Sequence, residues 1–353
     1  MLAKNLRIGK VMSNLAKVAR KPGSMGVASV PINFSPVHIE KSSDLNRFDR
    51  KGEVIENYSK NNHVNEYLSL DSKNIIEVQT YDEEIMNLVN EEAERQRKSI
   101  DLIASSNIPI AGVNEWTMLL GNKSSPGYPS GRFFNGDQCI DKVEKIWTKR
   151  ALDAFHLEEK NWHANVQSLS GSMANLCAFN AICEPGDTIL ALWTKVGGGH
   201  HTYGVSDEND KPTNLYSKIY NFEYYHLKEN GQINYENAYK TAMKVRPKVI
   251  IAGSSTYPRE IDWKKFRRIW DESGAIMMAD IAHGFGLKIA KVWGSPFPLA
   301  DIVTASTSKS MRGPRAGVIY SKKRYAKAVD NSVFPGVMGA PQNNSIGSLA
   351  ITF

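Results

Sequence analysis

The stretch Met277-Met278-Ala279-Asp280-Ile281-Ala282-His283 places an acidic residue directly after a continuous apolar run. Two similar runs, residues 188–193 and 248–253, come earlier in the chain, and a helical pattern over 263–272 separates the second of them from the run at 275–279. Apolar runs that are bounded by Gly or Pro and joined by helices are typical of parallel strands buried on both faces. The sequence therefore predicts an α/β fold with a mainly parallel sheet flanked by helices.

The spacing of apolar residues predicts several further elements. Helices are expected to begin near Asp82, to run around residues 140–155 and to span 172–183, and a further strand is expected over 301–305. In an open parallel sheet, ligands bind at the carboxyl ends of the strands. The residues that follow these strands are therefore the first candidates for a functional site.

The composition narrows the classes of partner. Of the 353 residues, 41% are hydrophobic and 23% are charged, as in ordinary globular proteins, and no apolar run approaches the roughly 20 residues that a membrane span requires. The formal charge is +7, and residues 1–39 supply +6 of it. The nearly neutral remainder argues against a nucleic acid as the main partner and favours a small molecule.

Residues 1–39 have the character of a basic amphipathic helix. The apolar residues Ile8, Val11, Met12, Leu15 and Val18 share one arc of the helical wheel, the basic residues occupy the other arc, and acidic residues are absent from the stretch. This pattern predicts a mitochondrial transit peptide, with a frayed basic tail as the alternative. Residues 40–78 are polar and are expected to form a linker or a poorly ordered extension, which leaves 79–353 as the large domain.

The three cysteines show no metal-binding pattern. Cys139, Cys177 and Cys183 lack CxxC or Cys/His spacing and are too few for a disulfide framework, so we expect no metal site. Cys177 and Cys183 fall within the apolar stretch 176–183 and are predicted to be buried.

Ser170-Gly171-Ser172 immediately precedes the helical pattern that continues to residue 183. Glycine lets the backbone come close to a ligand, the two hydroxyls can donate hydrogen bonds, and the free N–H groups of a helix start favour an anion. The stretch is therefore a candidate phosphate site. It also has the sequence of an ordinary helix N-cap.

Asp280 and Lys309 are two further candidates at strand ends. A carboxylate directly after a buried strand is costly unless a cation meets it, and a protonated pyridine nitrogen would serve as that cation. The alternative is an Asp that caps the following turn with His283 as its partner. Lys309 lies among small hydroxyl residues after the strand predicted at 301–305, where it can form an imine with an aldehyde if its pKa is lowered. A solvated basic loop is the alternative here.

The order of these three elements strengthens each of them. A phosphate site, a carboxylate after a strand and a lysine about 30 residues later on an α/β sheet make up the usual site of aspartate-aminotransferase-like enzymes. We therefore expect a pyridoxal-phosphate (PLP) dependent transferase of fold type I, with PLP as the cofactor.

Longer motifs give the sequence a family resemblance. Asp101-Leu102-Ile103-Ala104-Ser105-Ser106-Asn107 resembles a LIASEN motif, and Gly127-Tyr128-Pro129 with Arg132-Phe133-Phe134 resembles GYPGxRYY. Both are motifs of the serine hydroxymethyltransferase family, to which the sequence is similar over about residues 80–353. Further matches, in family order, are Val166 to Ser172 with Ala174-Asn175, Gly198-Gly199-His200, Met278 to His283, and Phe334-Pro335-Gly336 through Pro341.

The resemblance implies three catalytic residues. Lys309 would hold PLP as a Schiff base, Asp280 would pair with the pyridine nitrogen, and His200 would stack on the ring. The protonated pyridine would then stabilise the carbanion that remains when the serine side chain departs as formaldehyde, which tetrahydrofolate captures. The implied activity is the interconversion of serine and glycine.

The resemblance also implies further contacts with the cofactor and the amino acid substrate. The phosphate would be bound by Ser170, Gly171 and Ser172; the ring hydroxyl by Ser255 and His283; and the substrate by Ser105 and Arg315. Gly339 and Ala340 match a loop that reaches the phosphate of the neighbouring subunit, so a dimer with shared sites is implied.

Several positions depart from the family pattern. The EGYP glutamate is Pro126, the LIASEN glutamate is Ser106, two tyrosines are Ser124 and Phe134, the histidine before the lysine is Ser308, the second glycine of the phosphate loop is Ala340, and an apolar folate contact is Lys195. The family's small C-terminal domain, with its carboxylate-binding arginine, is expected to be absent, since the sequence given ends at Phe353 inside a predicted helix. These departures keep two alternatives open: a catalytically impaired PLP-binding subunit, as a homodimer or with an active homologue, and a folate-independent β-hydroxy amino acid aldolase.

Overall fold

The computed structural model describes residues 83–353, apart from 111, 114–123, 207–208 and 210. The chain divides into two units, Met1–Asn90 and Glu91–Phe353, and the sheet lies in the second. The transit peptide predicted over 1–39 and the linker predicted over 40–78 fall outside the described residues.

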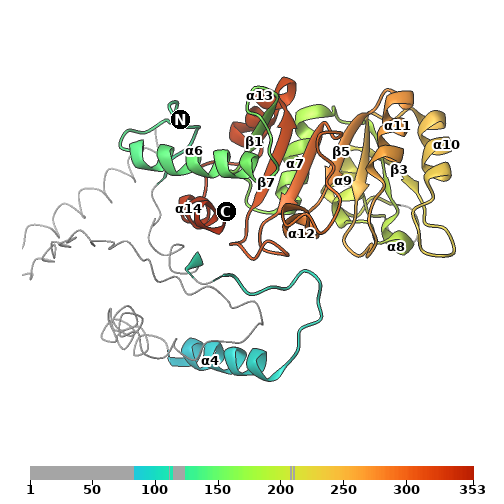
Figure 1. Cartoon of the computed structure of the whole chain (residues 1–353). Helices are drawn as coiled ribbons and strands as arrows, with labels where there is room; N and C mark the ends of the chain where they lie inside the picture. Colours follow the sequence, from blue (N-terminus) through green and yellow to red (C-terminus); the bar gives the residue numbers. More distant parts are fainter. Residues whose placement is uncertain (1–82, 111, 114–123, 207–208, 210) are drawn as a thin grey trace, which may run out of the picture. The chain divides into compact units, whose positions relative to one another are not determined.

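Seven strands form one sheet in the order β1-β7-β6-β5-β4-β2-β3 (Figure 1). Their bounds are β1 Trp162–Asn165, β2 Thr188–Leu192, β3 Asn221–Tyr225, β4 Val249–Gly253, β5 Ile276–Asp280, β6 Ile302–Ser306 and β7 Gly317–Lys322. From β3 to β6 every neighbouring pair is parallel, and β7 runs antiparallel to both β6 and β1. The predicted α/β class with a mainly parallel sheet is therefore confirmed.

Helices cover both faces of this sheet. The helices of the described residues, not all of which contact the sheet, are α4 Glu83–Lys98, α6 Gln138–Asp153, α7 Gly171–Ile182, α8 Thr194–Gly197, η2 His201–Tyr203, α9 Leu215–Ile219, α10 Tyr235–Val245, α11 Trp263–Ser273, α12 Phe285–Ile289, η3 Lys323–Tyr325, α13 Ala326–Asn331, η4 Ser332–Val337 and α14 Asn343–Thr352. The apolar cluster on one face contains residues of α6, α10, α11, α12 and α14, and the cluster on the other face contains residues of α7, α9 and α13.

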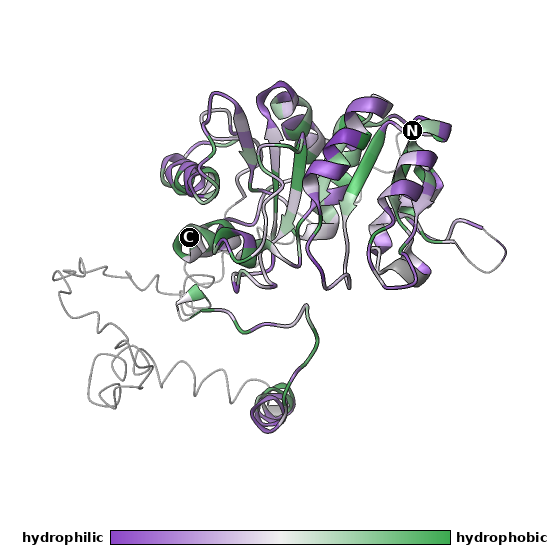
Figure 2. Ribbon diagram, turned by 45° about the vertical axis from the view of Figure 1, so that its right-hand side comes forward, coloured by the Kyte–Doolittle hydropathy of each residue, from purple (hydrophilic) through white to green (hydrophobic). Residues whose placement is uncertain are grey.

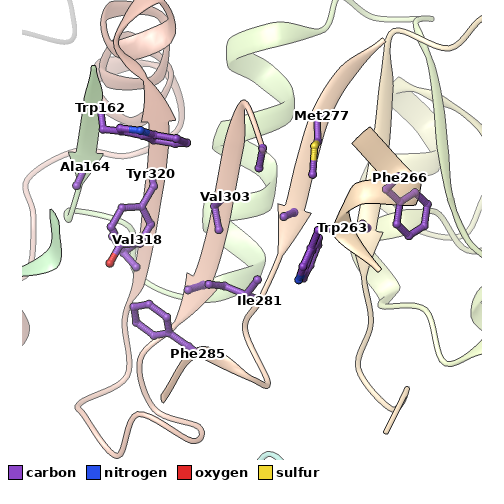
Figure 3. Close-up of a cluster of buried hydrophobic side chains, with 14 of the residues drawn as sticks. Trp162, Ala164, Trp263, Phe266, Met277, Ile281, Phe285, Val303, Val318 and Tyr320 are labelled. Atoms are coloured by element: carbon purple, nitrogen blue, oxygen red, sulfur yellow. The ribbon is translucent and has the colours of Figure 1, made fainter. Parts of the chain in front are cut away.

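The central strands β2, β4, β5 and β6 are mostly apolar because both of their faces are covered. Consecutive strand residues point to opposite faces, so Met277 joins one apolar cluster and Met278 the other. Figure 3 shows Met277 of β5 in the first cluster, together with Val303 of β6 and Tyr320 of β7. Figure 2 shows the same arrangement in its colours, with hydrophobic residues along the central strands and hydrophilic residues on the surrounding helices.

The structure also tests the smaller predictions. Cys177 and Cys183 are buried as predicted, and burial raises the pKa of each thiol to about 12. Over the described residues, every helix is too short or too polar to cross a bilayer. The same part of the chain contains no group of three His, Cys, Asp or Glu side chains that could hold a metal ion.

Candidate active site

A cavity of about 1280 Å³ lies at the carboxyl ends of β4, β5 and β6. It is lined by most of the residues predicted from the sequence: Ser105, Ser170, Gly171, Ser172, His200, Ser255, Asp280, His283, Lys309 and Arg315. The predicted residues Gly339 and Ala340 are exposed and are not part of its lining. The fold thus brings ten residues together from six separate stretches of the chain.

One end of the cavity is formed by the start of α7. Ser170 is the N-cap of this helix, and its Oγ accepts a hydrogen bond from the backbone N–H of Met173 at 3.2 Å. A Cβ at Gly171 would lie only 3.1 Å from the Cβ of Ser306, so glycine allows the helix to begin close against the end of β6. The N-cap and the phosphate site were alternatives in the sequence. The geometry is compatible with both, because the N-cap leaves the helix start facing the cavity.

Asp280 is the last residue of β5 and is 7% exposed. It pairs in register with Gly253 on β4 and with Thr304 on β6. A Cβ at Gly253 would lie 2.7 Å from the Cβ of Asp280 and 2.8 Å from the hydroxyl of Tyr203. Glycine at position 253 therefore makes room for the Asp280 carboxylate and for its tyrosine partner.

Three uncharged donors bind the Asp280 carboxylate. Its Oδ2 accepts hydrogen bonds from Asn175 Nδ2 and from the Tyr203 hydroxyl, both at 2.9 Å, and its Oδ1 accepts one from the backbone N–H of Ala282 at 3.0 Å. The bond from Ala282 is the turn cap considered from the sequence, but His283 is not among these described donors. The carboxylate is thus held in place by neutral groups and can still receive a cationic donor from the cavity.

Asn175 connects Asp280 to His200. Besides its bond to Asp280, the Nδ2 of Asn175 donates to Thr202 Oγ1 at 2.8 Å, and its Oδ1 accepts from Thr304 Oγ1 at 2.6 Å. The Oγ1 of Thr202 in turn lies 2.8 Å from His200 Nδ1. The backbone N–H of Thr202 donates to the same Nδ1 at 3.4 Å. Because Nδ1 accepts, the ring proton of neutral His200 resides on Nε2.

Sequence analysis did not identify Asn175, Thr202 or Tyr203 as site residues. Asn175 is 1% exposed and Thr202 and Tyr203 are fully buried, so their polar atoms depend on one another for hydrogen bonds. The available signal was the amide of Asn175 within the mostly apolar helix α7. Such a residue is costly to bury unless its hydrogen bonds are satisfied.

Lys309 lies on a short loop after β6 that is closed by Thr307. The Thr307 hydroxyl donates to the carbonyl of Pro314 at 2.6 Å and accepts from the N–H of Ala316 at 3.1 Å. Burial lowers the pKa of Lys309, and the charge of Arg315 lowers it further, while Asp280 opposes the shift. Lys309 is thus half-buried in the wall of the cavity, and the alternative interpretation as a solvated basic loop does not describe it.

The pKa of His200 is lowered strongly by its position in the wall of the cavity. Burial is the main cause and lowers its pKa to about 4; His201, Lys309 and His283 act in the same direction and Asp280 opposes them. His200 is therefore neutral at pH 7.

We expect the free energy of unfolding to fall as the pH is lowered from about 6.5 to about 4. In that range the unfolded chain binds a proton at residue 200, whereas the folded protein keeps His200 neutral. His200 can lower the free energy of unfolding by no more than about 1.4 kcal/mol for each pH unit of acidification. Urea unfolding at several pH values measures the slope. His200→Asn should make the slope shallower, and an unchanged slope would contradict the assignment.

Comparisons with known proteins agree with this geometry. Residues 78–353 match the profile of the family described as serine hydroxymethyltransferase. The chain belongs to the serine hydroxymethyltransferase family. A serine hydroxymethyltransferase from Desulfotalea psychrophila is 43% identical over 275 residues, which cover 78% of this chain and 62% of that relative. The chain therefore spans less than two thirds of the length of this relative.

The positions that depart from the serine hydroxymethyltransferase pattern fall in two places. Ser106 and Ser308 line the cavity, so hydroxyl groups stand there at positions where the family resemblance predicts an acid and an imidazole. Pro126 and Phe134 are not part of the described lining, and Phe134 is 56% exposed. None of these four residues is among the described hydrogen-bond donors to Asp280.

Proposed function

We propose that this chain binds PLP in the cavity and takes part in the interconversion of serine and glycine with tetrahydrofolate. The observation that carries the proposal is the convergence of three groups on one cavity. Lys309 offers an amine, Asp280 a buried carboxylate, and Ser170-Gly171-Ser172 the start of a helix. These are the groups that an aldehyde, a pyridine nitrogen and a phosphate require.

The residues present fit this cofactor physically. The volume of about 1280 Å³ exceeds the roughly 300–1,000 Å³ of a typical single-ligand pocket, which leaves room for an amino acid beside the cofactor. The Asp280 carboxylate is held by three neutral donors, so a protonated ring nitrogen would supply the missing positive charge. The lowered pKa of Lys309 favours the unprotonated amine that covalent attachment needs.

When bound, PLP supplies an electron sink for bonds at the substrate α-carbon. Asp280 would keep the ring nitrogen protonated, and the buried neutral ring of His200 would hold the cofactor ring from one side. Arg315, whose positive charge acts on Lys309, and Ser105 both line the cavity and would bind the amino acid substrate. Closure of the site by these groups would exclude water from the reacting carbon.

Two features support an oligomer as part of the proposal. Gly339 and Ala340 are exposed, and a Cβ at Gly339 would meet nothing within 4 Å, so this loop is accessible to a second subunit. Phe133 and Phe134 are also exposed, at 73% and 56%. We include a dimer of two copies, or one with an active homologue, in the proposal. The basic character of residues 1–39 supports a mitochondrial location in the same way.

The sequence departures favour a second candidate activity. Pro126 has no ionisable group, and Lys195 is an exposed, charged residue at the position of an apolar folate contact. A folate-independent aldolase for β-hydroxy amino acids needs the electron sink but not these contacts. A catalytically impaired subunit that binds PLP is the third outcome.

The decisive experiment adds PLP to the purified full chain, reduces the mixture with borohydride and maps the labelled lysine by mass spectrometry. We expect one label, on Lys309. Serine, with and without tetrahydrofolate, and a bulkier β-hydroxy amino acid then separate the activities by their glycine yield. Glycine from serine only with folate supports the main proposal, and folate-independent cleavage supports the second. Labelling spread over surface lysines would overturn the PLP assignment.

A further inference from the structure

We infer that His201 is a positioning residue that orients the Ser172 hydroxyl toward the phosphate of the cofactor and makes recognition of that phosphate sensitive to pH. The inference rests on the proposed PLP site and adds a residue that the family resemblance does not assign. His201 lines the same cavity as Ser172, and its Nε2 lies 3.2 Å from Ser172 Oγ.

Both partners are fixed by contacts of their backbone. The carbonyl of Ser172 accepts a hydrogen bond from the Tyr216 hydroxyl at 2.9 Å, and the carbonyl of His201 accepts one from Asn214 Nδ2 at 2.6 Å. The ring of His201 also packs against the ring of His200, with a centroid separation of 4.0 Å. These bonds fix the backbone on both sides of the contact, and ring packing against His200 supports the imidazole of His201, which is itself exposed.

Proton counting decides what this contact does to an anion. A serine hydroxyl has one proton. If His201 Nε2 accepts that proton, only lone pairs of Ser172 can face the phosphate, and the contact is repulsive. If Nε2 carries a proton and donates it to Ser172 Oγ, the hydroxyl proton is free to point at the phosphate. A bound phosphate therefore selects the forms of His201 that carry a proton on Nε2.

The charges around His201 set the direction of the pH effect. Burial is the main cause of its lowered pKa, Lys309 on the loop after β6 lowers it further, and Asp280 at the end of β5 opposes them. The first turn of α7 contributes no acidic residue, and the adjacent His200 is neutral at pH 7. A phosphate dianion at the helix start would raise the pKa of His201, so binding should take up a proton.

The test compares PLP with pyridoxal, which has the same ring and aldehyde but no phosphate. The measured quantity is the ratio of the two dissociation constants, obtained by spectral titration of the full chain. We expect His201→Leu to reduce the preference for PLP about tenfold. Loss of a purely structural residue would weaken both ligands equally and leave the ratio unchanged.

Two further variants separate orientation from charge. His201→Gln keeps a side-chain donor that does not titrate, so it should restore most of the preference at pH 8. In the wild type, the ratio of the two dissociation constants should favour PLP more strongly at pH 6.5 than at pH 8, by at most about tenfold per pH unit for one proton. In His201→Gln this ratio should change much less with pH, because glutamine does not titrate. Comparing variants at one pH cancels the titration of the phosphate itself. His226→Leu, at an exposed histidine, is the matched control and should behave as wild type.

The outcomes distinguish this inference from the proposed function. If neither PLP nor pyridoxal gives a lysine-bound spectrum, the proposed function fails. If both bind and the ratio is the same in wild type, His201→Leu and His201→Gln at both pH values, the PLP site stands and the role of His201 is wrong. Ser172→Ala provides the remaining check: it should lower the ratio by itself and remove any further effect of His201→Leu.

Discussion

Replacement of Lys309 with alanine is expected to abolish the absorption band of lysine-bound PLP completely. The amine of Lys309 lines the cavity together with Asp280 and the start of α7, and burial lowers its pKa, so it loses its proton more readily than a surface lysine. Without this amine the aldehyde has no covalent partner in the site. Difference spectra after addition of PLP and removal of the excess measure the effect.

Lys288 provides a matched control for this prediction. It is also a buried lysine, and burial lowers its pKa to about 8. Its Nζ donates to the carbonyl of Gly294 at 2.9 Å and lies 5.2 Å from the centroid of the Trp263 ring, and Lys288 is not part of the lining of the cavity that contains Lys309. Lys288→Met should keep the full band. A band that survives in Lys309→Ala and disappears in Lys288→Met would assign the attachment to the other lysine.

Replacement of Arg132 with methionine is expected to lower the free energy of unfolding by about 3–5 kcal/mol. Its side chain is 3% exposed and forms ion pairs with Glu144 at 2.6 Å and Asp141 at 2.8 Å. The guanidinium also donates to the carbonyls of Ser125 and Gly127, both at 2.8 Å. Methionine leaves the buried Glu144 carboxylate without its cation and the Ser125 carbonyl without its described donor, whereas the Gly127 carbonyl still accepts from Gln167 Nε2 at 3.0 Å. The midpoint of urea unfolding measures the loss.

The pH dependence and a double variant test the cause of this loss. Burial already raises the pKa of Glu144 and Arg132 opposes that shift, so in Arg132→Met the carboxyl should protonate readily and the loss should shrink as the pH falls. Adding Glu144→Gln should recover part of the stability. Arg268→Met removes an exposed pair with Glu272 and should lower the stability far less, because solvent screens this pair. An equal cost for the buried and the exposed pair would refute the argument.

Sequence periodicity predicted β2, β4, β5 and β6 but missed the edge strands β1 and β3 and also β7, which lies between β1 and β6. The runs at 188–193, 248–253 and 275–279 correspond to β2, β4 and β5, which helices cover on both faces. β3 is at one edge of the sheet, and its residues alternate between exposed and partly buried before a buried Tyr225. β1 has only four residues. Edge strands need fewer apolar residues, so their pattern is weaker.

The candidate site shows the same division between local and long-range information. Asp280, Lys309 and the Ser170-Gly171-Ser172 stretch each follow or precede a recognisable element, and the carboxyl ends of parallel strands meet at one edge of a sheet. Their convergence could therefore be predicted. The hydrogen-bonded set of Asn175, Thr202 and Tyr203 could not, because a buried polar side chain can choose its partner only after the backbones have packed.

The sequence by itself determined the α/β class, the order of the site elements and the family, because burial on both faces requires continuous apolar strands and the motifs lie at their ends. Only the tertiary structure decided what surrounds each charge. Asn175 and Tyr203 reach Asp280 across 105 and 77 residues, and this depends on Gly253 lying opposite Asp280 in the strand register. Hydrogen bonds act over about 3 Å, so partners distant in sequence are set by the packing of the backbone rather than by any local pattern.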